Sequence, residues 1–352
     1  MSLVSTLNIF YMYCYAWKLL REGKSLIVGA TDSPNAVEFF ARVFINGARL
    51  LLRRGLEQGY REIEDEVVGL RGRVLVGSSY RRLLIQQGKT ICRFDEMGHD
   101  TLNNRIIKST LEILIGVTVL QAETRRVIVS LLPRFADVSP IKLNASVFTQ
   151  ISLNRNNSYY ALILKLCELI FGHLLPTGDA GRFTFANPVD DETRMSAVFE
   201  EFVRVFCQTE LDGYTSAGRE DIQWVAGQMD REHARHLPKM QTDVTLRSFS
   251  RTLIVDAKFY KDIFVNFRDA EKLRSGHLYQ MFAYLKNCDH VANGVVPDGL
   301  LIYPSSERSI SLGYELGGHK IRLATVDLMM DWPDIDTRLR KLLAAYTSGT
   351  VA

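Results

Sequence analysis

Two acidic residues and a lysine lie within a stretch that otherwise has the pattern of a β-hairpin, TDVTLRSFSRTLIVDAKFY at residues 242–260. Side chains alternate faces along a strand, so Asp256 and Lys258 share one face. If residues 249–250 form a two-residue loop, counting inward places Asp243 directly opposite Asp256. Facing Cβ atoms in such pairs lie about 5 Å apart. The pattern therefore predicts two carboxyl groups close together, with an amine beside them.

Two facing carboxylates repel each other, and a divalent cation between them removes that cost. Oxygen ligands of this kind suit Mg²⁺, which needs only one or two carboxylates together with waters and a phosphate. Lys258 would then add positive charge where the phosphate sits. Two alternatives stay open: an exposed hairpin of mixed charge needs no metal, and a three-residue loop would shift the register and separate the acids.

Neither the cysteines nor the histidine pair His233 and His236 predicts a zinc site. The five cysteines are scattered and odd in number, which argues against a disulfide framework or a zinc ribbon and favours a reducing cytoplasm. His233 and His236 in REHARH share a helical face, but no nearby cysteine or H-E-x-x-H motif supports a metal there. We expect a loop at this position.

The composition is that of a soluble protein: of 352 residues, 47% are hydrophobic and 24% are charged. The length predicts two domains, or three small ones, and a net charge of +3 permits nucleic-acid contact without arguing for it. Residues 1–20 lack the basic region and cleavage site of a signal peptide. Lys165 and Glu168 interrupt the apolar run at 159–175, which is too short to span a membrane and predicts a buried helix.

Apolar spacing of three to four residues predicts the helices. They cover residues 7–20, 34–54, 101–115, 121–134, 159–171, 194–208, 276–286 and 334–346. Ser33 and Asp100 are the predicted N-caps of the second and third of these helices. Strands are expected within residues 61–95, in DIQWVAG, in the hairpin, in GLLIYP and in KIRLATVDL.

A polar, turn-rich segment, SLNRNNSYY, predicts a domain boundary near residue 155. Beyond it helices alternate with strands, which predicts a mixed sheet with helices on its faces. The expected fold is therefore α/β in the second half, α+β overall, with a mixed helical and β domain at residues 1–155 and a sheet domain at 156–352.

The order of these elements resembles the PD-(D/E)XK nuclease superfamily, whose signature would here be Pro238 and Asp243 followed by Asp256-Ala257-Lys258. Gln280 and Tyr284 lie four apart in LYQMFAYL and share a helix face. A Gln-x-x-x-Tyr helix after the D-x-K strand resembles the variant found in several DNA-processing nucleases.

The resemblance extends to the McrC family of nuclease subunits. It rests on blocks spread over nearly the whole chain: NIFYMYCYAW, RRGL, DTLNNRIIKSTLEILI, LPKMQTDVTLRS, LIVDAKFYK, LYQMFAYL and GLLIYP. McrC-like proteins pair with McrB, a hexameric AAA+ GTPase motor that reads methylated cytosine in DNA. The resemblance implies that residues 1–155 dock to the motor and stimulate its GTPase, whereas residues 156–352 cut double-stranded DNA with Mg²⁺. GTP would be bound by the partner.

The same resemblance implies roles for individual residues. Asp243 and Asp256, with the backbone carbonyl of Ala257, would hold Mg²⁺, and Lys258 would orient water or stabilise the transition state. Gln280 would contact the attacking water or the phosphate.

Two further roles are implied less directly. Tyr284 would contact the DNA backbone, although a packed surface helix explains the pair with Gln280 equally well. A glutamate on the helix before the sheet often joins the metal site in this superfamily, and Glu200 and Glu201 compete for that position. The order VFEEFV favours Glu200, and a solvated helix face remains the alternative.

Two other functions stay open at this point. The chain could be a non-catalytic adaptor that only activates an AAA+ GTPase, which the intact Asp243, Asp256 and Lys258 set argues against. It could also be a stand-alone nuclease, which the N-terminal 155 residues argue against because they carry no catalytic set of their own.

Overall fold

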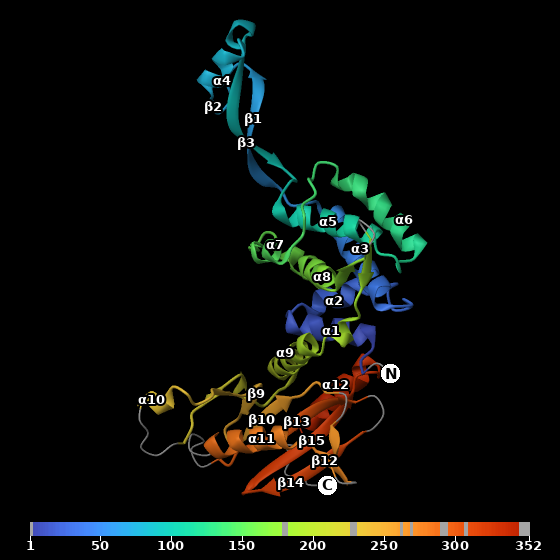
Figure 1. Cartoon of the computed structure of the whole chain (residues 1–352), viewed down its shortest axis with the longest axis vertical. Helices are drawn as coiled ribbons and strands as arrows, with labels where there is room; N and C mark the ends of the chain where they lie inside the picture. Colours follow the sequence, from blue (N-terminus) through green and yellow to red (C-terminus); the bar gives the residue numbers. More distant parts are fainter. Residues whose placement is uncertain are drawn as a thin grey trace. The chain divides into compact units, whose positions relative to one another are not determined.

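The computed structural model describes residues 3–177, 182–225, 231–260, 263–267, 270–288, 295–305 and 309–344. The chain forms two compact units. We call Met1–Gly23 with Asn187–Ala352 the sheet unit, and Lys24–Ala186 the arm unit. Figure 1 shows the elements of both.

The N-terminal helix belongs to the sheet unit, contrary to the prediction that residues 1–155 form one domain. Helix α1 (Thr6–Ala16) is nearly all buried and packs against α9 (Glu192–Glu210). The side-chain amide of Asn8 donates to the carbonyls of Leu328 and Met330, both at 2.8 Å. These contacts tie the start of the chain to its C-terminal part.

The other end of the arm unit lies beyond the predicted boundary at residue 155. Helix α8 (Ala161–Gly172), expected to open the second domain, packs instead against α3 (Ala36–Arg54) and α5 (Leu102–Ile115) of the arm unit. Its apolar face therefore completes the core of the unit formed by Lys24–Ala186. The turn-rich segment that suggested the boundary is a loop inside that unit.

A six-stranded mixed sheet forms the centre of the sheet unit, in the order β14-β15-β13-β10-β9-β6. Strands β10, β13 and β15 run parallel, and the other neighbours are antiparallel. The strands are β6 (Ser216–Gly218), β9 (Val244–Arg247), β10 (Thr252–Ala257), β13 (Asp298–Ser305), β14 (Ser311–Leu316) and β15 (His319–Asp327). The mixed sheet expected from the sequence is confirmed.

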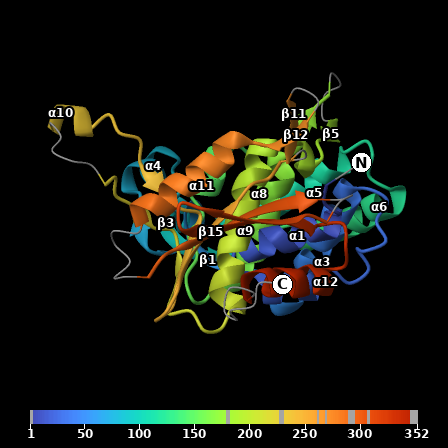
Figure 2. The same cartoon turned by 90° about the horizontal axis from the view of Figure 1, so that it is seen from below.

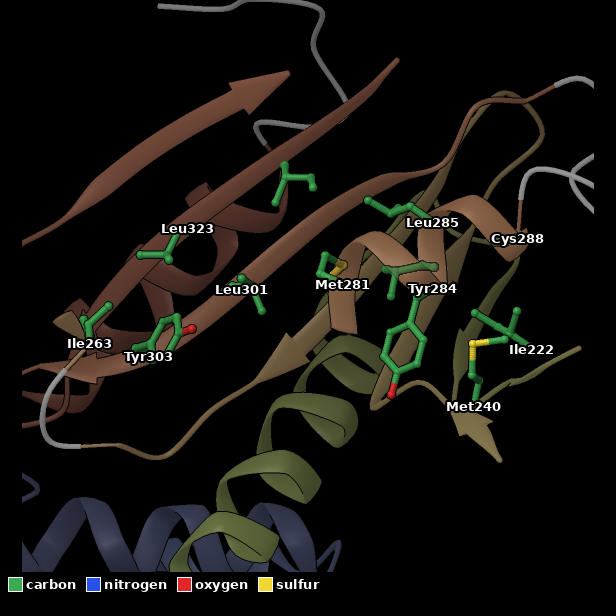
Figure 3. Packing of buried hydrophobic residues seen from close by; sticks show 12 residues of the cluster. Ile222, Met240, Ile263, Met281, Tyr284, Leu285, Cys288, Leu301, Tyr303 and Leu323 are labelled. Atoms are coloured by element: carbon green, nitrogen blue, oxygen red, sulfur yellow. The ribbon is translucent and has the colours of Figure 1, made fainter. Parts of the chain in front are cut away.

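Helices cover both faces of this sheet (Figures 1 and 2). Helix α11 (Ser275–Cys288) lies on one face, where Met281 and Leu285 pack with Ile254, Leu301 and Leu323 (Figure 3). Helix α9 lies on the other face with α1 and α12 (Trp332–Ala344). The expected layering of helices on a mixed sheet is therefore present.

Aromatic side chains fill the layer beneath α9. Phe199, Phe202 and Phe206 are fully buried along one stripe of the helix, as its spacing predicted. Phe202 meets Trp332 of α12 at 5.5 Å between ring centroids, and Phe199 meets Phe259 at 5.8 Å. Phe259 directly follows the β10 segment that carries the acidic residue and the lysine, so this layer anchors that segment.

Short elements surround the main sheet. They are η4 (Pro188–Asp190), β7 (Asp221–Ile222) paired with β8 (Met240–Gln241), α10 (Arg231–Ala234), and β11 (Phe264–Phe267) paired with β12 (Ala270–Leu273). The strand expected over DIQWVAG is thus only two residues long. His233 and His236 are exposed.

The arm unit combines a helical bundle with a long antiparallel pair of strands, β1 (Gly59–Val68) and β3 (Lys89–Gly98). Its remaining elements are α2 (Leu20–Leu26, which crosses into it), β2 (Arg73–Val74), α4 (Val76–Arg81), η1 (Ile85–Gln87), α6 (Ala122–Leu131), η2 (Leu132–Phe135), α7 (Ala145–Thr149), η3 (Ser158–Tyr160), β4 (Leu174–Pro176) and β5 (Phe183–Phe185). We call residues 59–98 the arm. Its strand-like character was predicted.

A partly buried carboxylate fixes the base of the arm. Glu57 accepts hydrogen bonds from the side-chain amides of Asn103 at 2.8 Å and Asn157 at 2.7 Å. The Asn104 amide donates to the backbone carbonyls of Glu57 at 2.9 Å and His99 at 2.7 Å. The residues that enter and leave the arm are therefore held by one network.

Two helix N-caps differ from the sequence prediction. Asn35, not Ser33, caps α3 and accepts from the N–H of Glu38 at 2.9 Å, whereas Ser33 donates to the carbonyl of Ala30. Thr101, not Asp100, caps α5. The Asp100 carboxylate instead accepts a hydrogen bond from Arg105, whose guanidinium holds the pKa of Asp100 well below its usual range.

The predicted first helix is also split in two. It ends at Ala16, because Lys18 adopts a left-handed backbone with φ of 59°, and α2 begins at Leu20.

Within the described residues, no helix has the length and apolarity needed to cross a lipid bilayer. All five cysteines lie within the described residues and are buried as thiols that form no disulfide.

Candidate functional site

The hairpin has the predicted register. In the antiparallel pair β9 and β10, Leu246 lies opposite Leu253 and Val244 opposite Val255. The Ser248 N–H donates to the Arg251 carbonyl at 2.8 Å, which closes a two-residue loop. Asp243 therefore lies one step beyond the last paired residue of β9.

Asp243 is held against the strand that carries the second acid. Its Oδ2 accepts a hydrogen bond of 2.9 Å from the backbone N–H of Ala257. Backbone pairing between β9 and β10 has already ended at this point. The carboxylate therefore accepts from the Ala257 N–H in place of a backbone carbonyl of the neighbouring strand. The carboxyl groups of Asp243 and Asp256 are thereby brought to the same end of neighbouring strands.

Asp256 is a buried acid that is only partly satisfied. Its side chain is 1% exposed, and its Oδ2 lies 2.9 Å from Nζ of Lys258. This contact confirms that Asp256 and Lys258 share a face. Among the described residues, Oδ1 of Asp256 has no hydrogen-bond partner. A buried acceptor left unpaired costs about 1–3 kcal/mol, so this oxygen is suited to a ligand.

Burial and mutual repulsion favour a proton on the acids. Burial, followed by the charge of Asp243, raises the pKa of Asp256 to about 6, although Lys258 opposes the shift. Burial also raises the pKa of Asp243 despite the Ala257 N–H and the charge of Lys258. Burial is the largest single influence on Lys258 and would lower its pKa, but the charge and hydrogen bond of Asp256, together with the charge of Asp243, outweigh it and raise the pKa.

Glu200, rather than Glu201, faces this group from α9. Burial, followed by the charge of Asp243, raises the pKa of Glu200, and Lys258 opposes that shift. Glu201 is instead paired with Arg204. The structure does not gather Glu200 into a ligand shell: among the described residues no three His, Cys, Asp or Glu side chains are placed to hold one metal ion. A metal role for Glu200 stays a prediction.

Gln280 and Tyr284 form a chain of hydrogen bonds that ends in the backbone before Asp243. The Gln280 amide donates to the Tyr284 hydroxyl at 2.7 Å, and that hydroxyl donates to the Gln241 carbonyl at 2.9 Å. Tyr284 is 6% exposed and packs beside Met240 (Figure 3). In this structure it positions the Asp243 segment from within the core, and its contact with DNA stays a prediction.

Two groups of residues near the acids were not singled out from the sequence. Arg204 and Arg219 both act electrostatically on Asp243 and Glu200. The spacing of Arg204, one helical turn after Glu200, is the one signal that could have indicated it.

The second group is an imidazole–phenol pair. His277 Nδ1 and the Tyr303 hydroxyl are 2.9 Å apart, and burial, followed by the charge of Lys258, lowers the pKa of His277 to about 4. His277 is therefore neutral at physiological pH.

The donor set fits Mg²⁺. Two carboxyl groups on adjacent strands, one with a buried unpaired oxygen, supply the hard oxygen ligands that this ion prefers. Burial is the main cause of the raised pKa values of both acids, so ionising them in this site is costly unless positive charge is close by. A divalent cation would supply that charge.

Comparison with known proteins places the chain in a family. A family model described as "McrBC 5-methylcytosine restriction system component" matches residues 7–304. The chain belongs to the McrBC family. The match includes every residue of the candidate site, since Glu200, Asp243, Asp256, Lys258 and Gln280 all lie inside it.

One curated McrBC relative and one solved structure extend this finding. The type IV methyl-directed restriction enzyme EcoKMcrBC of Escherichia coli strain K12 is 34% identical over 339 residues, which is 96% of this chain and 97% of that protein. The fold is similar, with a TM-score of 0.62 and 17% identity, to a chain in an assembly of Thermococcus gammatolerans McrB AAA+ hexamers with bound McrC. That match covers 97% of this chain and 76% of the other.

Proposed function

We propose that this McrBC family member is a Mg²⁺-dependent endodeoxyribonuclease subunit that cuts DNA carrying modified cytosine. In this proposal it has the PD-(D/E)XK nuclease fold, works with a hexameric AAA+ GTPase that binds the GTP, and stimulates that GTPase. The observation that carries the proposal is the convergence of Asp243 and Asp256 beside Lys258, with one carboxylate oxygen buried and unpaired.

Asp243 and Asp256, with the Ala257 carbonyl, would hold the ion. When bound there, Mg²⁺ would polarise the phosphodiester and lower the pKa of a water ligand. The Ala257 N–H already fixes Asp243 in place, so one of the two ligands is oriented before any ion arrives. Such preorganisation is what a catalytic site requires.

Lys258 keeps its proton in this site, because the neighbouring acids raise its pKa. The Lys258 side chain is 15% exposed. Its ammonium group can stabilise negative charge that develops on the phosphate. Gln280 is half-buried and would orient the attacking water or the phosphate. Tyr284 holds Gln280 and the Gln241 carbonyl in position.

The partner is proposed from the relatives. The solved Thermococcus assembly contains McrB AAA+ hexamers with bound McrC, and the Escherichia coli relative is a methyl-directed restriction enzyme. We propose an equivalent motor for this chain and docking through the arm unit, which carries none of the candidate catalytic residues.

The test uses the full chain with and without its AAA+ partner, GTP and Mg²⁺, on methylated and unmethylated plasmids. Wild type is expected to linearise methylated plasmid only with all components present. Asp256→Asn should abolish cleavage while leaving the GTPase stimulation unchanged. Asp212→Asn is the matched control, since Asp212 is an exposed acid of the same unit, and it should cut like wild type.

Other outcomes point to other functions. Cleavage by the chain alone would identify a stand-alone nuclease. Stimulation of the partner's GTPase without any cleavage by wild type would identify a non-catalytic adaptor, and full activity of Asp256→Asn would remove the proposed site.

A further inference from the structure

Two arginines lie beside the candidate site without a role in the mechanism above. Arg219 directly follows β6, whose Gly218 pairs with Thr245 of β9. The backbone therefore carries Arg219 alongside the β9 residues that lead to Asp243. Arg204 lies on α9, one helical turn after Glu200.

The two guanidinium groups differ in burial and in attachment. The Arg204 side chain is 14% exposed and is paired with Glu201. The Arg219 side chain is 43% exposed, and its Nη2 lies 3.4 Å from the carboxylate of Glu200. Charge-assisted hydrogen bonds are normally 2.7–2.9 Å long, so Glu200 holds Arg219 only loosely.

The charges of the site explain why Arg219 is available to another anion. Glu200, Asp243 and Asp256 carry the acidic groups, and Arg204, Arg219 and Lys258 carry the basic ones. Burial, followed by the charge of Arg219, lowers the pKa of Arg204, which means that the two guanidinium groups repel each other. Of the two guanidinium groups, that of Arg219 is the more exposed and is therefore the one that an anion from solvent can reach.

We propose that Arg219 binds a backbone phosphate of the DNA next to the cleaved bond, exchanging its loose contact with Glu200 for that phosphate. The planar guanidinium suits two parallel hydrogen bonds to phosphate oxygens. This inference rests on the proposed nuclease function and adds a substrate-binding residue to it.

A purely structural role makes a different prediction. If Arg219 serves only to neutralise Glu200, removing the charge of Glu200 makes Arg219 dispensable. If Arg219 binds phosphate, its loss weakens DNA binding whether or not Glu200 is charged.

The experiment measures DNA affinity against salt for the complex with the AAA+ partner, using Asp256→Asn protein so that nothing is cleaved. The partner contributes equally to all variants and cancels in their differences. Arg219→Gln is expected to weaken binding about ten-fold, since charge-assisted hydrogen bonds are the stronger class, and to reduce the salt slope by about one. Arg219→Lys should keep the slope and lose part of the affinity.

Two comparisons make the result decisive. Arg322→Gln is the control, because Arg322 is a partly exposed arginine of the same unit that bonds the Ser311 hydroxyl, and it should leave the slope unchanged. The Arg219→Gln effect should persist in a Glu200→Gln background. An unchanged slope in Arg219→Gln, or an effect that vanishes with Glu200→Gln, would overturn the proposal.

Failure of this inference can be told apart from failure of the nuclease proposal. Cleavage by wild type, measured in parallel with its partner, tests the nuclease. The salt slope of the non-cleaving protein tests Arg219 alone. In the cleaving protein, Arg219→Gln should raise KM more than it lowers kcat.

Discussion

The carboxylate of Asp243 and the backbone N–H of Ala257 are joined by a hydrogen bond of 2.9 Å. This bond holds the Asp243 carboxylate against Ala257, the residue between Asp256 and Lys258. The backbone pairing between β9 and β10 has already ended at this point. The hydrogen bond therefore serves two purposes, satisfying a buried N–H and presenting a carboxylate beside Asp256.

Replacement of Asp243 should separate these two purposes. An asparagine keeps an oxygen that can accept from Ala257, whereas an alanine leaves that N–H unpaired. Both variants remove the repulsion of Asp256, so their difference isolates the hydrogen bond. We expect Asp243→Ala to be less stable than Asp243→Asn by about 1–3 kcal/mol in urea unfolding, and both to lose Mg²⁺ binding. Equal unfolding midpoints would show that the bond contributes nothing.

The pKa of Asp256 predicts how stability depends on pH without metal. Its folded pKa of about 6 lies above the unfolded value of about 3.9. The protonated acid therefore favours the folded state, and this stability is complete below about pH 4 and lost as the pH rises through about 6. Asp256→Asn removes the part of the pH dependence that Asp256 contributes.

The check is the melting temperature of both proteins from pH 4 to 8 in EDTA. Wild type should lose stability relative to Asp256→Asn across that window. Mg²⁺ should reverse part of the loss at the upper end, since it binds the deprotonated acids. Parallel curves for the two proteins would mean that Asp256 is not perturbed.

Tyr284→Phe tests the hydrogen-bond chain on α11. It removes the hydroxyl that joins Gln280 to the Gln241 carbonyl and should cost about 1–2 kcal/mol, with a modest fall in kcat. Tyr279→Phe is the matched control on the same helix, because Tyr279 is 70% exposed, and it should change neither. If Tyr284→Phe weakens DNA binding without loss of stability, the hydroxyl contacts DNA as the sequence suggested.

Glu57→Ala tests the base of the arm. The substitution leaves the buried amides of Asn103 and Asn157 without their acceptor and should destabilise the arm unit by about 1–3 kcal/mol. Stimulation of the partner's GTPase should fall, because the arm loses its fixed base. Mg²⁺ binding by the sheet unit should stay as in wild type, and equal losses in both assays would indicate general unfolding instead.

The sequence predicted the hairpin and its register because a two-residue loop and strict alternation leave few alternatives. It could not assign the direction of the Tyr284 hydroxyl, since a Gln-x-x-x-Tyr spacing is the same whether the tyrosine points to solvent or into the core. Helix caps at Asn35 and Thr101 were missed by one or two residues, because neighbouring Ser33 and Asp100 are equally good caps in isolation. Local hydrogen bonds decided the outcome: Ser33 donates to the Ala30 carbonyl, and the Asp100 carboxylate accepts from Arg105.

The division of the chain into two units was the feature hardest to predict from the sequence. The loop near residue 155 has the composition of a linker, yet α8 beyond it completes the arm unit. Arg219 was missed for a similar reason, because only the pairing of β6 with β9 brings it near Asp243. Contacts between distant segments leave no local pattern.

The most direct test of the metal site is a crystal structure of the full chain with Mn²⁺ in place of Mg²⁺, analysed by anomalous scattering. The account predicts one peak about 2.1 Å from carboxylate oxygens of both Asp243 and Asp256, with Lys258 beside it. A fully occupied peak elsewhere, or none between these acids at a pH well above 6, would contradict it.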